Sequence, residues 1–223
     1  VPDGQYSFYL HSDDRTDIAA MATISTISQP LRGEFIRTAA TAGAVVYQVD
    51  ARLPALIPVF FAGQLSAVRL CAVMALVSGT WSSLTGLPDE PENGEAALPV
   101  SPETEYQRRR YTLTLQNDRS GERVESVLTE ASSRLRGDLL RNLIITGLAL
   151  HTTAPELPRL LASMPVPPTS VSELQALVQQ MAGTADVNRA AAAVPDTPTA
   201  SAAPVSGSDT REIKKNMRRA FGD

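Results

Sequence analysis

Apolar and polar residues alternate in two short stretches of the chain, residues 6–11 and 110–116. Such alternation is typical of a β-strand with one buried face. A lone strand followed by helices has no partner of its own, and unpaired strand edges are unstable. We therefore expect the two strands to pair with each other or with those of a second chain. The residues expected to face inward are Tyr6, Phe8, Leu10, Tyr111, Leu113 and Leu115.

Helical periodicity follows each stretch. Polar capping residues come first, at 12–14 and 117–120, and apolar residues at helical spacing come next. A second helix is predicted to begin near Arg32-Gly33 and near Arg136-Gly137, each with an acidic residue in its first turn. Both halves of the chain therefore have the order strand, helix, helix.

The two halves are a tandem duplication. Tyr6 and Tyr111 are 105 residues apart, whereas Arg32 and Arg136 are 104 apart, so the second copy is one residue shorter between these points. The correspondence continues into the Leu-Pro segments at 53–54 and 157–158. A repeat of this length predicts two copies of one structural unit.

The expected fold class is mostly α, with two ribbon-helix-helix units in tandem that share a two-stranded antiparallel ribbon. Each unit carries additional C-terminal helices. The predicted segments are the first unit at 1–80, an acidic, proline-rich linker at 81–107, the second unit at 108–183, a disordered tether at 184–208, and a C-terminal amphipathic helix at 209–223.

The most apolar segment, Leu53 to Gly79, raises the question of a membrane span. Its prolines and Arg69 interrupt it, and its counterpart in the second copy, Leu157 to Gly183, contains charged residues and several glutamines. We therefore expect two buried helices rather than a span. An alternative reading of the surplus apolar residues is a protein interface.

Composition limits the function classes further. The lone Cys71 excludes an internal disulfide and fits a buried thiol in a cytosolic protein, and the start of the sequence shows no secretory leader. We expect a cytoplasmic protein. Its net charge of −4 disfavours DNA binding, although the excess of acid lies in 82–101, away from the predicted strands.

Two motifs carry a family resemblance. Phe8-Tyr9-Leu10-His11 leading into acids, and Arg32-Gly33-Glu34-Phe35-Ile36-Arg37 followed by a Leu-Pro helix, resemble ParR, the centromere-binding adaptor of actin-type plasmid segregation. The resemblance covers about residues 5–80 and again 110–183, and the tandem copy departs from the usual single copy per chain. It implies a ribbon that binds repeated DNA sites and a C-terminal segment that binds an actin-like ParM filament.

Outward ribbon side chains are chemically suited to reading bases, since arginine pairs with guanine, glutamine with adenine, and threonine with several groups. The starts of the second helices offer free amides to a phosphate. A simpler interpretation of His11 is a residue at the end of the strand, and a simpler interpretation of the triple arginine is a solvated face or a disordered turn. The candidate DNA-binding residues are Ser7, Tyr9, His11, Arg32, Gly33, Arg108, Arg109, Arg110, Thr112, Thr114, Gln116, Arg136 and Gly137. Arg37 and Arg141, one turn further on, can instead pair with Glu34 and Asp138.

The last residues have a different character. Three apolar residues at a spacing of four form one stripe beside several cations, which predicts a short basic amphipathic helix that reaches a partner. Alternatives are docking on its own core and binding to an anionic membrane surface. The candidate filament-binding residues are Ile213, Lys214, Met217, Arg218 and Phe221.

No catalytic motif stands out, because the sequence has no glycine-rich phosphate loop with lysine, no HExxH and no cysteine pair. We expect no enzyme activity, cofactor or metal. The expected partners are double-stranded DNA with centromere-like repeats, a ParM-type filament and further copies of the chain on DNA, but neither a small-molecule substrate nor a membrane. The alternatives are a ribbon-helix-helix relaxosome accessory factor or autorepressor, and an adaptor without DNA binding that links filaments to a membrane or protein.

Overall fold

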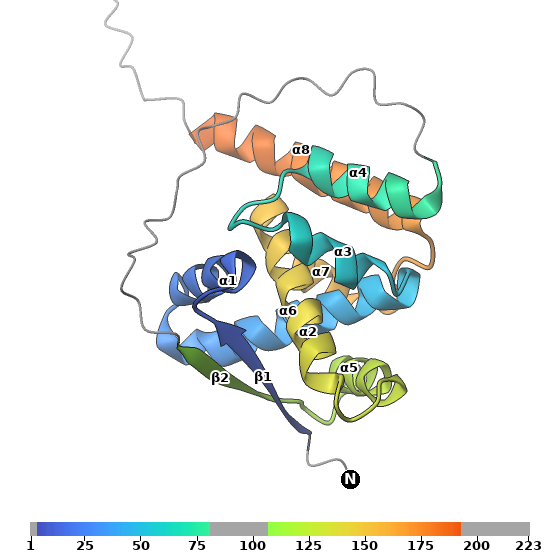
Figure 1. The fold of residues 1–223 in the computed structure, drawn as a ribbon. Coiled ribbons are helices and arrows are strands. Elements are labelled where there is room, and N and C mark those ends of the chain that lie inside the picture. Colours follow the sequence, from blue (N-terminus) through green and yellow to red (C-terminus); the bar gives the residue numbers. More distant parts are fainter. Residues whose placement is uncertain (1–3, 81–106, 193–223) are drawn as a thin grey trace, which may run out of the picture. The chain divides into compact units, whose positions relative to one another are not determined.

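The computed structural model describes residues 4–80 and 107–192, with side chains as far as residue 183. The described residues as far as Asn188 form one compact unit, mostly helical, with a single two-stranded antiparallel sheet. The elements, in order, are β1 (Gln5–His11), α1 (Arg15–Ser25), the short 3-10 helix η1 (Gln29–Leu31), α2 (Arg32–Val49), α3 (Leu53–Phe60), α4 (Ala67–Ser78), β2 (Arg108–Thr114), α5 (Arg119–Glu130), α6 (Arg136–Thr153), α7 (Leu157–Ser163) and α8 (Val171–Ala192) (Figure 1).

The two strands pair with each other inside the chain. Gln5 lies opposite Thr114 and His11 opposite Arg108, in an antiparallel register. Ser7 and Thr112 also lie opposite each other, and they are equivalent residues because the strands repeat at an offset of 105. Antiparallel pairing centred on two equivalent residues creates a local twofold axis, as in a symmetric dimer. The chain is therefore a pseudo-dimer, and the expected pairing of the two strands is confirmed.

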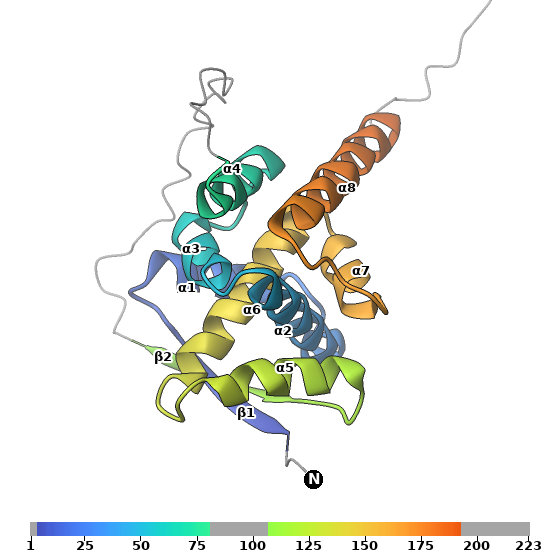
Figure 2. The same ribbon diagram turned by 90° about the vertical axis from the view of Figure 1, so that its right-hand side faces the viewer.

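The same axis relates α2 and α6, which cross against each other (Figure 2). A Cβ added at Gly43 would fall on the backbone of Leu143, and one added at Gly147 would fall on the backbone of Ala39. These are two copies of one contact, because both pairs are equivalent at the offset of 104 that holds after the strands. Glycine is required at both positions because only a residue without a side chain lets the helix backbones touch.

Both copies bury one common core. The inner ribbon face contributes Phe8, Leu10 and Leu113 to it. The helices exchange partners between copies, since α3 packs on α6 and α7 packs on α2. The two repeats consequently fold together as one body, although they follow one another along the chain.

Each first helix begins as its polar residues predict. The Asp14 side chain accepts a hydrogen bond from the amide of Asp17, at 2.9 Å, and the Asp118 side chain accepts one from the amide of Gly121, at 2.7 Å. Each carboxylate satisfies an amide that the helix leaves without a backbone acceptor. The caps are equivalent residues, so the second copy loses its residue between strand and cap.

The apolar segment from Leu53 forms two helices, α3 and α4, as expected. Buried side chains such as Leu53, Ile57 and Leu70 account for much of its apolar character. Among the described residues no helix combines the length and apolarity needed to cross a membrane.

Two predicted boundaries need correction. All three residues Arg108–Arg110 belong to β2, so the triple arginine is part of the strand and not a turn before it. The helix α8 runs through Ala192, into the segment 184–208 predicted as a tether. Residues 184–192 are rich in alanine and contain no proline, which favours continuation of a helix that has already started. Residues 81–106, the tether beyond 192 and the predicted helix at 209–223 lie outside the described residues.

Candidate nucleic-acid interface

The ribbon turns a polar face away from the core. Residues directly opposite each other in an antiparallel pair point to the same side, and successive residues alternate sides. The core-facing side chains Phe8 and Leu113 therefore fix which residues point outward. These are Gln5, Ser7, Tyr9 and His11 of β1 and Arg108, Arg110, Thr112 and Thr114 of β2.

Arg109 does not belong to this face. It lies opposite Leu10, whose side chain is buried, and its guanidinium carbon is 5.3 Å from the ring centroid of Tyr111. Its side chain thus extends along the inner side of the ribbon end. The alternation of the strand separates Arg109 from Arg108 and Arg110, which the sequence grouped as one cluster.

The two outward arginines are held along the ribbon surface. The guanidinium of Arg108 lies over the ring of Tyr9, 3.5 Å from its centroid. Arg110 donates from Nε and Nη2 to the Ser7 hydroxyl, at 3.2 and 2.9 Å. Cation–π contact and hydrogen bonding both restrict these long side chains, so each cation has a preferred position before any ligand arrives.

The second helices flank the ribbon. At one edge, a Cβ added at Gly137 in the first turn of α6 would lie 3.5 Å from the backbone oxygen of Ser7. At the other edge, Arg37 Nε in α2 donates to the backbone oxygen of Thr114, at 3.2 Å. Helix starts carry free amides and a positive dipole end, which favour an anion beside each edge.

Arg32 and Arg136 hold the helix starts in place. Arg32 Nε donates to the Ile27 carbonyl at 2.8 Å, and Arg136 Nε donates to the equivalent Ala131 carbonyl at 3.2 Å. Each guanidinium thereby caps the end of the preceding helix. Gly33 faces open space, with no atom within 4 Å of a built Cβ. Gln116 lies beyond the end of β2, in the exposed segment before α5.

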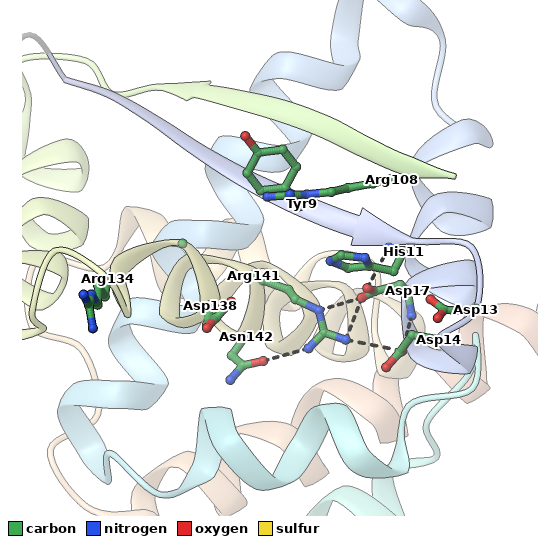
Figure 3. A pocket seen from close by; sticks show the side chains of 11 residues that line it. Tyr9, His11, Asp13, Asp14, Asp17, Arg108, Arg134, Asp138, Arg141 and Asn142 are labelled. Carbon is green, nitrogen blue, oxygen red and sulfur yellow. Dashed lines mark hydrogen bonds and ion pairs between the residues drawn. The ribbon is translucent and has the colours of Figure 1, made fainter. Parts of the chain in front are cut away.

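A polar pocket of about 660 Å³ adjoins the ribbon at the end of β1 (Figure 3). It brings the ribbon residues Tyr9, His11 and Arg108 together with the start of α6. The remaining lining residues are Asp13, Asp14, Asp17, Arg134, Gly137, Asp138, Arg141 and Asn142.

An ion-pair network closes this pocket on the inside. Arg141 Nε donates to Asp17 at 2.6 Å, and Arg141 Nη2 reaches Asp14 at 3.3 Å. Asp17 also accepts the backbone N–H of His11, at 2.9 Å, and is 1 % exposed. Burial raises the pKa of Asp17, while the hydrogen bonds from His11 and Arg141 act in the opposite direction.

This network was not predicted from the sequence. The predicted partner of Arg141 was Asp138, whereas Arg141 pairs with Asp14 and Asp17 of the other copy. The predicted pairing of Arg37 with Glu34 does occur. The sequence feature that could have indicated the network is Asp17, a charged residue whose equivalent in the second copy is a glycine.

A comparison with protein families gives two matches in this chain. The family described as plasmid stability protein matches residues 4–74 and again residues 109–178. The chain belongs to the plasmid stability protein family. Each match covers most of one strand and the helices that follow it, so both repeats of this chain match the same family model. No curated protein and no solved structure matches the chain.

Proposed function

We propose that this member of the plasmid stability family maintains plasmids by binding double-stranded DNA through the outer face of its ribbon. The observation that carries the proposal is the pairing of β1 with β2 inside one chain, with polar side chains outward and a second helix at each edge. A two-stranded ribbon fits the major groove, where base edges are distinguishable. The helix starts then lie where phosphates pass.

Each outward group has a chemical role in this proposal. Arg108 and Arg110 donate to guanine, and the hydroxyls of Ser7, Thr112 and Thr114 accept, donate or touch a thymine methyl. The amides around Gly33 and Gly137 receive phosphates, because glycine permits close approach. The net charge of −4 limits non-specific attraction, so specific contacts must contribute much of the affinity.

The test is binding to DNA that flanks the protein's own gene, over a salt series with unrelated DNA as competitor. The matched variants are Arg108→Ala/Arg110→Ala on the ribbon and Arg159→Ala on the exposed side of α7. We expect binding that survives competitor in the parent and in Arg159→Ala, and at least about a tenfold loss in the ribbon variant. Equal affinity for the two DNAs at low salt would remove the proposal.

We further propose that several chains line up on repeated sites and that the segment 209–223 binds a ParM-type actin-like filament. The support is the apolar stripe of Ile213, Met217 and Phe221 beside basic residues. Truncation before Asp209 should leave DNA affinity unchanged and abolish co-sedimentation with the filament. Co-sedimentation that persists after truncation would place the filament contact elsewhere.

A further inference from the structure

The two ends of the outward ribbon face differ in chemistry. At one end Gln5 lies opposite Thr114, and both side chains are neutral. At the other end Tyr9 lies opposite Arg110, and His11 lies opposite Arg108. The outward arginines are therefore both at one end of the ribbon.

This difference arises where the duplication has diverged. The local axis passes between Ser7 and Thr112, and it exchanges Gln5 with Arg110 and Tyr9 with Thr114. In a dimer of identical chains these pairs would be identical, and both ends of the ribbon would present the same groups. Among the outward residues, only the central pair, Ser7 and Thr112, has kept closely similar side chains, each a short aliphatic hydroxyl.

The edges of the ribbon differ as well. At the arginine end, the backbone of His11 is held by the buried Asp17, which Arg141 holds in turn. At the neutral end, Arg37 instead donates to the backbone of Thr114 and pairs with Glu34. The divergence therefore extends from the ribbon surface to the structure that supports it.

We infer that the ribbon reads a non-palindromic DNA site and binds it in one orientation, an inference that rests on the proposed DNA binding. A symmetric dimer favours a palindrome because each half of the protein reads an identical half-site. In this pseudo-dimer the half-site under Arg108 and Arg110 contains guanine. The half-site under Gln5 and Thr114 contains bases that glutamine and threonine contact, such as adenine and thymine.

Acidic residues near the arginine end favour base contacts over phosphate contacts for Arg108 and Arg110. Asp13 and Asp138 line the pocket at the same end, and their carboxylates weaken the attraction of the two arginines for the DNA backbone. The backbone of Arg110 lies at this end, opposite Tyr9, and its guanidinium reaches toward the Ser7 hydroxyl at the centre of the ribbon. Arginine at such a position is suited to the two acceptors of guanine.

The first experiment selects binding sites from random-sequence duplexes and then fixes the orientation of the protein on the selected site. An iron chelate that cuts DNA nearby is attached to a Gln107→Cys variant in which Cys71→Ala removes the native thiol. Residue 107 is exposed and directly precedes β2, at the arginine end. Short duplexes with a single site keep one chain on each DNA.

We expect a selected site without internal symmetry and cleavage on one side of it, at least about tenfold stronger than on the other, which corresponds to the loss of one good base contact. Equal cleavage on both sides would overturn the inference and leave DNA binding standing. Failure to enrich any site would remove the proposed function, and the inference with it.

The internal symmetry supplies a matched pair of variants. Gln5→Arg/Arg110→Gln exchanges equivalent residues, keeps the composition, and moves an arginine to the other end beside the hydroxyl of Thr112. The guanine selected under Arg110 should then shift to the half-site farther from the chelate, whereas the guanine under Arg108 should stay. Ser7→Thr/Thr112→Ser exchanges two hydroxyls and should leave the site unchanged. If the exchange variant fails to fold, Arg110→Gln alone should still reduce the one-sided cleavage, and no reduction would contradict the role of Arg110.

Discussion

The first helix of each copy starts from the same aspartate cap, yet the residue three positions later is Asp17 in the first copy and Gly121 in the second. In the first copy the Asp17 carboxylate bridges the strand and α6. In the second copy a Cβ at Gly121 would fall on the backbone of Gln116. The missing residue before this helix brings strand and helix closer, so glycine replaces a bridging carboxylate.

The ends of the two last helices differ in a similar way. Gly79 ends α4 in a left-handed conformation, with φ of 72°, whereas its equivalent Gly183 lies inside the longer α8. By contrast, Gly43 and Gly147 make the same contact from both copies. The two copies have thus kept the crossing of α2 with α6 and have diverged at the start of the first helix and at the end of the last helix.

The largest expected effect lies at the shared crossing. Gly43→Ala or Gly147→Ala places a methyl group on the backbone of the facing helix, which can be relieved only by moving the two helices apart. We expect each change to lower the free energy of unfolding by about 3 kcal/mol or more, measured by chemical denaturation.

The control in the same helix is Gly33→Ala. No atom lies within 4 Å of its built Cβ, so this change should be neutral or stabilising by up to about 1 kcal/mol. Equal tolerance at residues 33 and 43 would show that the helices do not meet at Gly43 and that the shared axis is misplaced.

The second largest effect on the free energy of unfolding concerns the acidic partners of two equivalent arginines, Arg141 and Arg37. Asp17→Ala leaves Arg141 without its buried partner and the His11 amide without its acceptor, and should cost about 2 kcal/mol. Glu34→Ala removes the exposed partner of Arg37 and should cost less than about 1 kcal/mol. Denaturation of both variants in parallel measures the difference. Similar losses in both would mean that the network in the first copy adds nothing.

The third prediction is that replacing glycine by alanine at two equivalent positions changes stability in opposite directions in the two copies. Gly79→Ala forces a side chain into a left-handed conformation and should destabilise by about 1 kcal/mol. Gly183→Ala replaces glycine inside a helix, next to open space, and should stabilise by about 0.5 to 1 kcal/mol. Thermal unfolding of the two variants tests this directly. Lower thermal stability in both variants would indicate that α8 ends at Gly183, as α4 ends at Gly79.

Sequence alone predicted the features that repeat. The alternation around Phe8 and Leu113, the polar capping segments and the start of each second helix follow from local patterns that appear twice. The duplication also predicted that the strands pair, because a single strand has no partner of its own. The structure adds that the partner strand belongs to the same chain.

The features that sequence missed depend on contacts across the axis. Arg141 has an acid within one helical turn, and nothing local indicates that it binds Asp17 of the other copy instead. Arg109 adjoins two outward arginines, and only the register of β2 shows that it points the other way. The extent of α8 was missed because its composition resembles that of a tether, although alanine also favours a helix.

The smallest expected effect lies on the surface of α3 and α4. Val59, Val68 and Leu76 are exposed, and the equivalent residues in the second copy are the polar residues Ser163, Ser172 and Gln180. Because the same fold accepts polar residues at these positions, the triple variant Val59→Ser/Val68→Ser/Leu76→Gln should keep the free energy of unfolding within about 0.5 kcal/mol of the parent. Denaturation of the isolated protein measures this value. A larger loss would show that these side chains are buried in the first copy, and that the two copies differ in packing as well as in surface chemistry.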